Sequence, residues 1–196
     1  FNPPIMGWSS WNAFLVDISE DIIKHQADLM VEKGLKDAGY QYINVDDGYF
    51  GKRDENGVMQ ANEKRFPNGM KPVADHIHSL GMKAGLYTDA GTRTCGSLWN
   101  KDSIGIGAGI YGHEPQDAQL YFGDWGFDFI KIDYCGGEVL GLDEKERYTS
   151  IRNSIDKVNK NVSINICRWA YPGTWAKDAA TSWRISGDIN AHWGSL

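Results

Sequence analysis

The sequence lacks several features that would each assign the chain to a class. No apolar stretch reaches the roughly 18 residues that a membrane-spanning helix needs. No run of basic residues occurs, and a net charge of −6 argues against nucleic acid or an anionic membrane surface as a partner. No signal peptide is present, so we expect a chain that is cytoplasmic or already processed. This charge balance suits a neutral substrate handled by carboxylates.

Cysteine is also scarce. Cys95, Cys135 and Cys167 are too few for a disulfide scaffold, although they could form one bridge and leave one thiol. Their spacing lacks the paired short-range pattern of a zinc site, so we expect no metal. Tryptophan, in contrast, is abundant, with eight residues in a chain of 196. Tryptophan faces stack well on sugar rings but also fill cores, and composition leaves both interpretations open.

Short apolar runs alternate along the chain with helical patterns. We expect strands at residues 40–45, 83–88, 127–132, 162–167 and 182–186, with a weaker candidate at 4–8. We expect helices at 19–33, 69–80, 117–125 and 143–159, a brief helix within 170–181, and a loop at the glycine-rich stretch 105–112. Strand–helix alternation of this kind predicts an α/β fold with a parallel sheet.

The expected strands nearly all end in polar and aromatic residues, which favours a TIM (β/α)8 barrel over an open doubly wound sheet. In a barrel all these ends converge on one face, whereas an open sheet uses only one or two crevices. No glycine-rich nucleotide fingerprint follows the first strand. Only about six βα units are visible, and a barrel needs eight. We therefore interpret residues 1–196 as a single catalytic barrel domain, truncated after strand six.

Lys131 and Asp133 stand two residues apart at the end of the fourth expected strand, so their side chains point the same way. One interpretation is a structural ion pair. The other is a nucleophilic Asp133 that the neighbouring cation keeps ionised through a depressed pKa.

A second carboxylate, Asp188, ends the sixth expected strand and shares a strand face with Arg184. It could approach Asp133 across the barrel mouth, and two carboxylates that flank a scissile bond are the minimal equipment for glycoside hydrolysis. The alternative is that Asp188 caps a helix. Asp46 and Asp47 could bind sugar hydroxyls or form a turn with the following glycine, and Asp89 has the same ambiguity.

Taken together, these strand ends resemble glycoside hydrolase family 27, the α-galactosidases and α-N-acetylgalactosaminidases. The matching segments occur in the right order over nearly the whole chain: PIMGWSSWN at 4–12, VDDG at 45–48, GLYTD at 85–89, TCG at 94–96, DWG at 124–126, KIDYC at 131–135 and WRISGD at 183–188. Any one of these is a weak signal, but all of them in register form a strong one.

The resemblance implies a role for each matching residue. Asp133 would be the nucleophile and Asp188 the general acid/base. Cys95 and Cys135 match a disulfide pair of the family. Contacts to the sugar would come from Trp11 as an apolar wall, Tyr87 near the nucleophile, Asp46 and Asp47 at the 6- and 4-hydroxyls, Lys131 at the 3- and 4-hydroxyls, Arg184 near the 2- and 3-hydroxyls, and Cys167 with Arg168 near the 2-position.

Two departures from the family pattern stand out. The family usually reads Cys-Glu-Trp after strand five, whereas this chain reads Cys167-Arg168-Trp169. A cation thus replaces an anion, and the bulk of Arg168 and Tyr171 argues against a 2-acetamido group. The loop over residues 96–115 is longer than usual and could reshape the aglycone side. The retained Asp46-Asp47 pair argues against a β-L-arabinopyranosidase.

The resemblance therefore implies a retaining hydrolase that releases terminal α-linked galactose by double displacement, without a metal or organic cofactor. Its partner would be a carbohydrate substrate, not nucleic acid or a membrane, and its location secreted or periplasmic. The alternatives are another family 27 specificity (α-N-acetylgalactosaminidase, β-L-arabinopyranosidase or isomaltodextranase-like), a non-catalytic sugar-binding module, or an unrelated barrel such as a phosphate-using isomerase.

Overall fold

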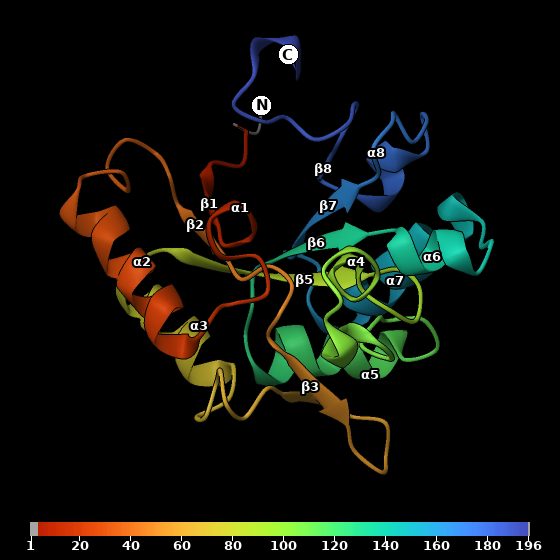
Figure 1. The fold of residues 1–196 in the computed structure, drawn as a ribbon, viewed down its shortest axis with the longest axis horizontal. Coiled ribbons are helices and arrows are strands. Elements are labelled where there is room, and N and C mark those ends of the chain that lie inside the picture. Colours follow the sequence, from red (N-terminus) through yellow and green to blue (C-terminus); the bar gives the residue numbers. More distant parts are fainter. Residues whose placement is uncertain (1–3, 196) are drawn as a thin grey trace.

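The computed structural model describes residues 4–195 and contains one curled parallel sheet of six strands. Figure 1 shows the strands side by side in chain order, and the sheet order is β1-β2-β5-β6-β7-β8. Their bounds are β1 Gly7–Ser9, β2 Tyr42–Asn44, β5 Lys83–Asp89, β6 Phe129–Asp133, β7 Ser163–Cys167 and β8 Ser182–Trp183. An order that never reverses has no topological switch point, so the sheet is not doubly wound. The predicted parallel α/β architecture is confirmed as a partial barrel.

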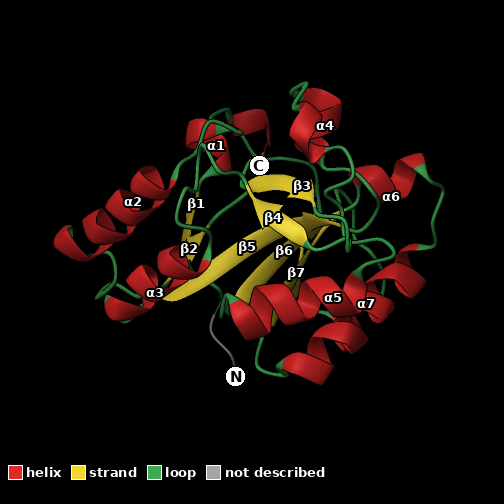
Figure 2. Cartoon of the chain, turned by 90° about the horizontal axis from the view of Figure 1, so that it is seen from below, coloured by secondary structure: helices red, strands yellow, loops and turns green. Residues whose placement is uncertain are grey.

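Longer helices cover the outside of this sheet, and shorter ones lie over the carboxyl ends of its strands (Figure 2). The outer helices are α2 Glu20–Glu32, α3 Lys71–Ser79, α5 Glu114–Ala118 with its π-helical continuation η2 Gln119–Asp124, and α7 Glu144–Val158. The short helices over the strand ends are α1 Trp11–Phe14, α4 Cys95–Trp99 and α6 Cys135–Val139. The short α8 Ala176–Ala179 instead packs against α7 and precedes β8, and the 3₁₀ turns are η1 Ser103–Gly105 and η3 Trp193–Ser195. Among residues 4–195, none of the helices has the length and apolar character that crossing a bilayer requires.

Local capping explains where two of the outer helices begin. The Ser19 hydroxyl accepts a hydrogen bond from the Ile22 amide at the start of α2, and the Asp143 carboxylate accepts one from the Glu146 amide at the start of α7. Each cap satisfies an amide that has no partner within the helix. Both helices start within a residue of the predicted position because the capping signal is local.

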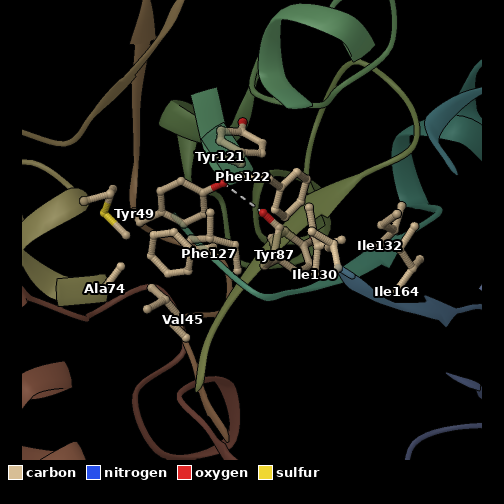
Figure 3. Close-up of a cluster of buried hydrophobic side chains, with 14 of the residues drawn as sticks. Val45, Tyr49, Ala74, Tyr87, Tyr121, Phe122, Phe127, Ile130, Ile132 and Ile164 are labelled. Carbon is tan, nitrogen blue, oxygen red and sulfur yellow. Dashed lines mark hydrogen bonds between the residues drawn. The ribbon is translucent and has the colours of Figure 1, made fainter. Parts of the chain in front are cut away.

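The hydrophobic core lies between the sheet and the outer helices. Figure 3 shows Tyr87 of β5 and Ile130 of β6 in one buried cluster with Ala74 of α3 and with Val45 and Tyr49, which follow β2. The Tyr49 hydroxyl donates a hydrogen bond of 2.9 Å to the Tyr87 carbonyl, so a buried polar group is paired. The central strands β5 and β6 therefore form a rigid support for the residues at their ends.

One feature of the structure was not expected, and two expected elements have different bounds. The antiparallel hairpin β3 (Phe50–Arg53) with β4 (Met59–Ala61) was not predicted, because its strands are short and one is half polar. The strand expected over 182–186 is confined to Ser182–Trp183, which pairs only with β7. The helix expected over 117–125 begins earlier, at Glu114, because Pro115 suits the first helical turn.

The long segment 96–115 is attached to this hairpin by Arg53. The guanidinium of Arg53 forms two bonds of 2.7 Å with the fully buried Asp117 carboxylate and donates to the carbonyls of Gly107 and Gly109 at 3.2 and 2.9 Å. Paired bonds of this kind combine charge with fixed geometry. The predicted loop over 105–112 is thus confirmed as irregular structure, but it is firmly held.

Candidate active site

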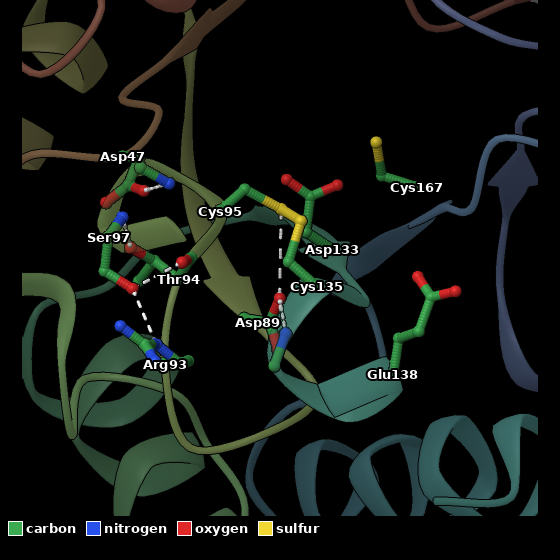
Figure 4. Close-up of a disulfide and its surroundings, with 12 residues drawn as sticks. Asp47, Asp89, Arg93, Thr94, Cys95, Ser97, Asp133, Cys135, Glu138 and Cys167 are labelled. Carbon is green, nitrogen blue, oxygen red and sulfur yellow. Dashed lines mark hydrogen bonds between the residues drawn. A yellow bond between two sulfur atoms is a disulfide. The ribbon is translucent and has the colours of Figure 1, made fainter. Parts of the chain in front are cut away.

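One pocket of about 580 Å³ lies over the carboxyl ends of the parallel strands, within the roughly 300–1,000 Å³ range of small-molecule sites. It brings together nine of the ten residues that the sequence predicted for catalysis or sugar binding: Trp11, Asp46, Asp47, Tyr87, Lys131, Asp133, Cys167, Arg184 and Asp188. The tenth, Arg168, does not line it. Figure 4 shows Asp133 and Cys167 on neighbouring strands at this face.

Asp133 ends β6 and is only 4% exposed. Its Oδ2 lies 3.8 Å from Lys131 Nζ, which also donates to Asp46 Oδ2 at 3.0 Å. Lys131 lies over the Tyr87 ring, 5.1 Å from its centre. Asp133 Oδ1 is buried and has no hydrogen-bond partner among the described residues. A buried carboxylate oxygen without a partner is costly, which marks it as an atom available for chemistry.

The electrostatics of Asp133 differ from the sequence expectation. Burial raises the pKa of Asp133, and the opposing effect of Lys131 does not cancel it. The predicted depression of this pKa is therefore wrong in direction, because desolvation of a nearly inaccessible carboxylate outweighs the cation at 3.8 Å and the smaller lowering effects of Cys167 and Tyr87. For Lys131, burial lowers the pKa, but the charges of Asp46 and Asp133 outweigh it and the net shift is upward. Lys131 thus stays cationic between two carboxylates.

Asp46 and Asp47 follow β2 and are both nearly inaccessible. The Ser9 hydroxyl donates to Asp46 Oδ2 at 3.2 Å. Asp47 Oδ2 accepts a hydrogen bond of 2.8 Å from the Gly96 amide, and a Cβ at position 96 would lie 2.5 Å from that oxygen, so only glycine fits there. Burial raises the pKa of Asp47 to about 7 against the lowering effect of bonds from Thr94 and Gly96.

Asp188 lies beyond β8 in an open position, with 76% of its side chain exposed. Arg184 pairs with the Asp188 carboxylate, and Arg184 Nη1 lies 3.8 Å from Cys167 Sγ. Burial lowers the pKa of Arg184, but the bond to Asp188 reverses this and the net shift is upward. Asp188 lines the same pocket as Asp133.

The disulfide joins the first residues of α4 and α6, as the resemblance implied, and Cys167 is a buried free thiol (Figure 4). Asp89, one of the ambiguous acids, lies below this bridge and does not line the pocket. Its carboxylate accepts hydrogen bonds from the amides of Gly91 and Gly136, which makes it a structural residue. Asp89, Cys95 and Cys135 are close enough to suggest a metal site, but a disulfide offers no thiolate ligand.

Arg168, which does not line the pocket, is paired with two carboxylates. Its Nε donates to Glu144 Oε1 at 2.6 Å and its Nη1 lies 3.5 Å from Glu138 Oε2. The argument against a 2-acetamido group relied on the bulk of Arg168 and Tyr171 inside the pocket, and neither residue lines it. That argument is therefore not supported by the geometry.

Sequence reasoning missed several residues that line the pocket: Leu15, Trp99, Asn100, Glu138 and Trp169. The sequence did not show which of Trp8 and Trp11 would face the sugar. Trp11 lines the pocket, while Trp8 packs against the core and meets Phe14 edge to face. Two of the missed residues could have been found from the cysteine pair, because each is close in sequence to one of the two cysteines. Trp99 follows Cys95 by four residues and Glu138 follows Cys135 by three.

Carboxylates and tryptophans gather over the carboxyl ends of a partial parallel barrel, the face at which proteins of the (β/α)-barrel class carry their active sites. Comparison with known proteins narrows this class. The chain belongs to the family described as alpha galactosidase A, whose model matches residues 3–196, and the resemblance to glycoside hydrolase family 27 is confirmed.

Individual relatives agree with this assignment. The chain is 43% identical to alpha-galactosidase A of Cellvibrio japonicus over 97% of its own length and 45% of the relative. It is 42% identical to alpha-galactosidase of Cyamopsis tetragonoloba over 98% of its length and 45% of the relative. The structure of the Saccharomyces cerevisiae alpha-galactosidase with raffinose superposes with a TM-score of 0.85 at 36% identity, covering 96% of this chain and 41% of that one. The chain thus spans about half the length of the relatives it matches.

Proposed function

We propose that the protein hydrolyses terminal α-linked galactosides with net retention of configuration, with Asp133 as nucleophile and Asp188 as general acid/base. The observation that carries the proposal is a buried Asp133 whose Oδ1 has no partner, in the same pocket as Asp188. The names of the two relatives compared above, both alpha-galactosidases, support the choice of galactose.

The proposed reaction has two displacements. First, Asp133 attacks the anomeric carbon while protonated Asp188 gives its proton to the leaving glycosidic oxygen. Ionised Asp188 then takes a proton from water, whose oxygen attacks the same carbon and releases Asp133. Each step inverts the centre, so the product retains the configuration of the substrate. This route requires the two carboxyl groups roughly 5–5.5 Å apart when substrate is bound.

Lys131 fits a supporting role in this route. A cation 3.8 Å from Asp133 opposes the rise in pKa caused by burial and favours the ionised form that attacks. Lys131 and the neighbouring Asp46 offer a donor and an acceptor within 3.0 Å of one another, which suits adjacent sugar hydroxyls. Asp47, Trp11 and Arg184 complete the proposed sugar contacts.

We further propose that residues 1–196 form the first part of one catalytic (β/α)8 barrel. β1 and β8 each have a single strand neighbour, so the curled sheet has two edges that further strands could join. A secreted or periplasmic location is proposed because the disulfide requires an oxidising compartment.

The function is tested with a panel of nitrophenyl glycosides and with proton NMR of the first product formed. We expect turnover of the α-galactoside above the α-N-acetylgalactosaminide, α-glucoside and β-L-arabinopyranoside, with α-galactose appearing before mutarotation. Absence of α-galactoside turnover would leave a sugar-binding module or another specificity. Initial β-galactose would mean inversion and would remove Asp133 as nucleophile.

A further inference from the structure

The pocket has a second group of residues that the proposed mechanism does not use. They come from α4 and α6, the two short helices whose first residues form the Cys95–Cys135 disulfide. Trp99 is the last residue of α4, and Glu138 lies one turn into α6. Both line the same cavity as Asp133 and Asp188. The disulfide therefore joins two elements that both contribute to the lining of this cavity.

Trp99 is 77% exposed although it lines the cavity. A large aromatic ring left in water loses the free energy that burial would provide, so the position is unfavourable unless something covers the ring. Asn100, the next residue, also lines the cavity and adds an amide that can donate and accept. An apolar face beside polar groups matches the chemistry of a sugar ring.

Glu138 pairs with Arg168, which does not itself line the cavity. Arg168 Nη1 lies 3.5 Å from Glu138 Oε2, while Arg168 Nε is bound to Glu144 Oε1 at 2.6 Å. The guanidinium also lies over the rings of Tyr134 and Trp169, at 5.5 and 5.9 Å from their centres. Arg168 is thus anchored by another carboxylate and two rings, so it can orient Glu138.

The side chain of Glu138 is 62% exposed, and its contact with Arg168 is made through Oε2. Figure 4 shows its carboxylate directed to the same side of the sheet as the carboxylate of Asp133. An exposed carboxylate is a strong acceptor for a hydroxyl.

The backbone under Glu138 is fixed. The Gly136 amide donates to both oxygens of Asp89 at 3.0 Å, and a Cβ on Gly136 would lie 2.4 Å from the Arg93 carbonyl oxygen. With the disulfide one residue earlier, α6 has no freedom to slide. The backbone that carries Glu138 is therefore already ordered before a ligand binds, which reduces the conformational entropy lost on binding.

We propose that Trp99 and Glu138 form a binding position for the second sugar ring, the one attached to the terminal galactosyl unit. Trp99 stacks on the apolar face of that ring, and Glu138, oriented by Arg168, accepts a hydrogen bond from one of its hydroxyls. This inference rests on the proposed function, since the second ring is the leaving group of that reaction. Arg168 is then a positioning residue for the leaving sugar.

The test compares two substrates that share the galactosyl unit. Galactosyl-α-1,6-glucose carries a second ring and methyl α-galactoside does not. For Trp99→Ala and for Glu138→Gln we expect the ratio of kcat/KM for the disaccharide to that for the methyl glycoside to fall about tenfold, the size of one aromatic or charge-assisted contact. Trp99→Phe, which keeps a ring, should recover most of the ratio. Arg168→Met should lower the ratio less than Glu138→Gln does.

Glu146→Gln is the matched control, because Glu146 is a carboxylate of α7 that does not line this pocket, and its ratio should match the parent's. Calorimetric titration of the Asp133→Asn background with the disaccharide and with galactose repeats the comparison without turnover. If the Trp99 and Glu138 variants lost equal affinity for the disaccharide and for galactose, or lost none for either, the second-ring site would be overturned. A parent that turns over neither glycoside would refute the proposed function, and the titration would then decide the second-ring site by itself.

Discussion

The two proposed catalytic carboxylates occupy very different surroundings. Asp133 ends a strand that is paired on both sides, by β5 and β7, and is 4% exposed. Asp188 lies in a loop beyond a two-residue strand that is paired on one side, and its side chain is 76% exposed. Sheet register therefore positions the first carboxylate, whereas one ion pair with Arg184 holds the second.

This difference suits the proposed division of roles. A nucleophile must be held in a fixed orientation toward one carbon, and a residue at the end of a rigid strand is held in this way. A general acid/base must contact the leaving group and then water, which an accessible loop position allows. The following predictions test this contrast between the buried and the exposed carboxylate, from the largest effect to the smallest.

The largest effect is expected for Asp133→Asn, which keeps the shape of the side chain and removes its charge. Without an ionised nucleophile the first displacement fails, so kcat/KM for a nitrophenyl α-galactoside should fall by at least about 10⁴-fold. Circular dichroism should show an unchanged fold. A variant within tenfold of the parent would contradict the assignment of the buried carboxylate.

Asp188→Asn should have a smaller effect that depends on the substrate. Loss of the proton donor should lower the rate about 10²–10⁴-fold for a sugar leaving group. A dinitrophenyl leaving group needs little protonation, so its release should be much less affected. Measuring both substrates sharpens the contrast, and equal losses on the two would exclude Asp188 as the acid.

Lys131→Met removes the cation between Asp46 and Asp133 and leaves two buried carboxylates unpaired. We expect a loss of about 3–5 kcal/mol in the free energy of unfolding, measured with urea. In the same variant the pKa of Asp133 should rise further, so the acid limb of the pH profile of hydrolysis should move to higher pH. Lys71→Met, in an exposed helical pair with Asp75, is the control and should cost less than about 1 kcal/mol. Similar losses in both variants would contradict the buried pairing.

Asp47 and Asp89 predict a pH dependence of stability. Burial raises the pKa of each to about 7, above the ordinary value of 3.8. Between these values the folded state binds more protons than the unfolded state, so stability should fall as the pH rises from about 4 to about 7. The slope should be about 1.4 kcal/mol per pH unit for each group. Asp89→Asn should remove the contribution of Asp89 to this slope. The slope is measured by urea unfolding at several pH values. An unchanged slope would contradict the raised pKa.

The smallest effect is expected for the exposed pair. Asp188→Ala removes the partner of Arg184, but an exposed ion pair contributes only about 0–1 kcal/mol to stability. Thermal unfolding should therefore be nearly the same as in the parent. A large loss of stability would show that the loop beyond β8 is held more firmly than its exposure indicates.

Local patterns were sufficient to predict much of the fold and the site. The alternation of apolar runs and helical periods predicted the parallel sheet, and the polar residue after each run predicted which side chains would meet. The family resemblance implied the Cys95–Cys135 bridge. The hairpin β3–β4 was missed because its strands are too short for period-two alternation to be visible.

Chain chemistry by itself determined which residues stand at the carboxyl ends of strands, because strand periodicity and strand order are local or nearly local properties. Tertiary structure alone decided how those residues behave. Burial raised the pKa of Asp133 despite Lys131, and Arg168, expected to contact the sugar, is instead bound to Glu144 of α7. Desolvation and ion pairing depend on distances through space, and these exist only after the strands have packed.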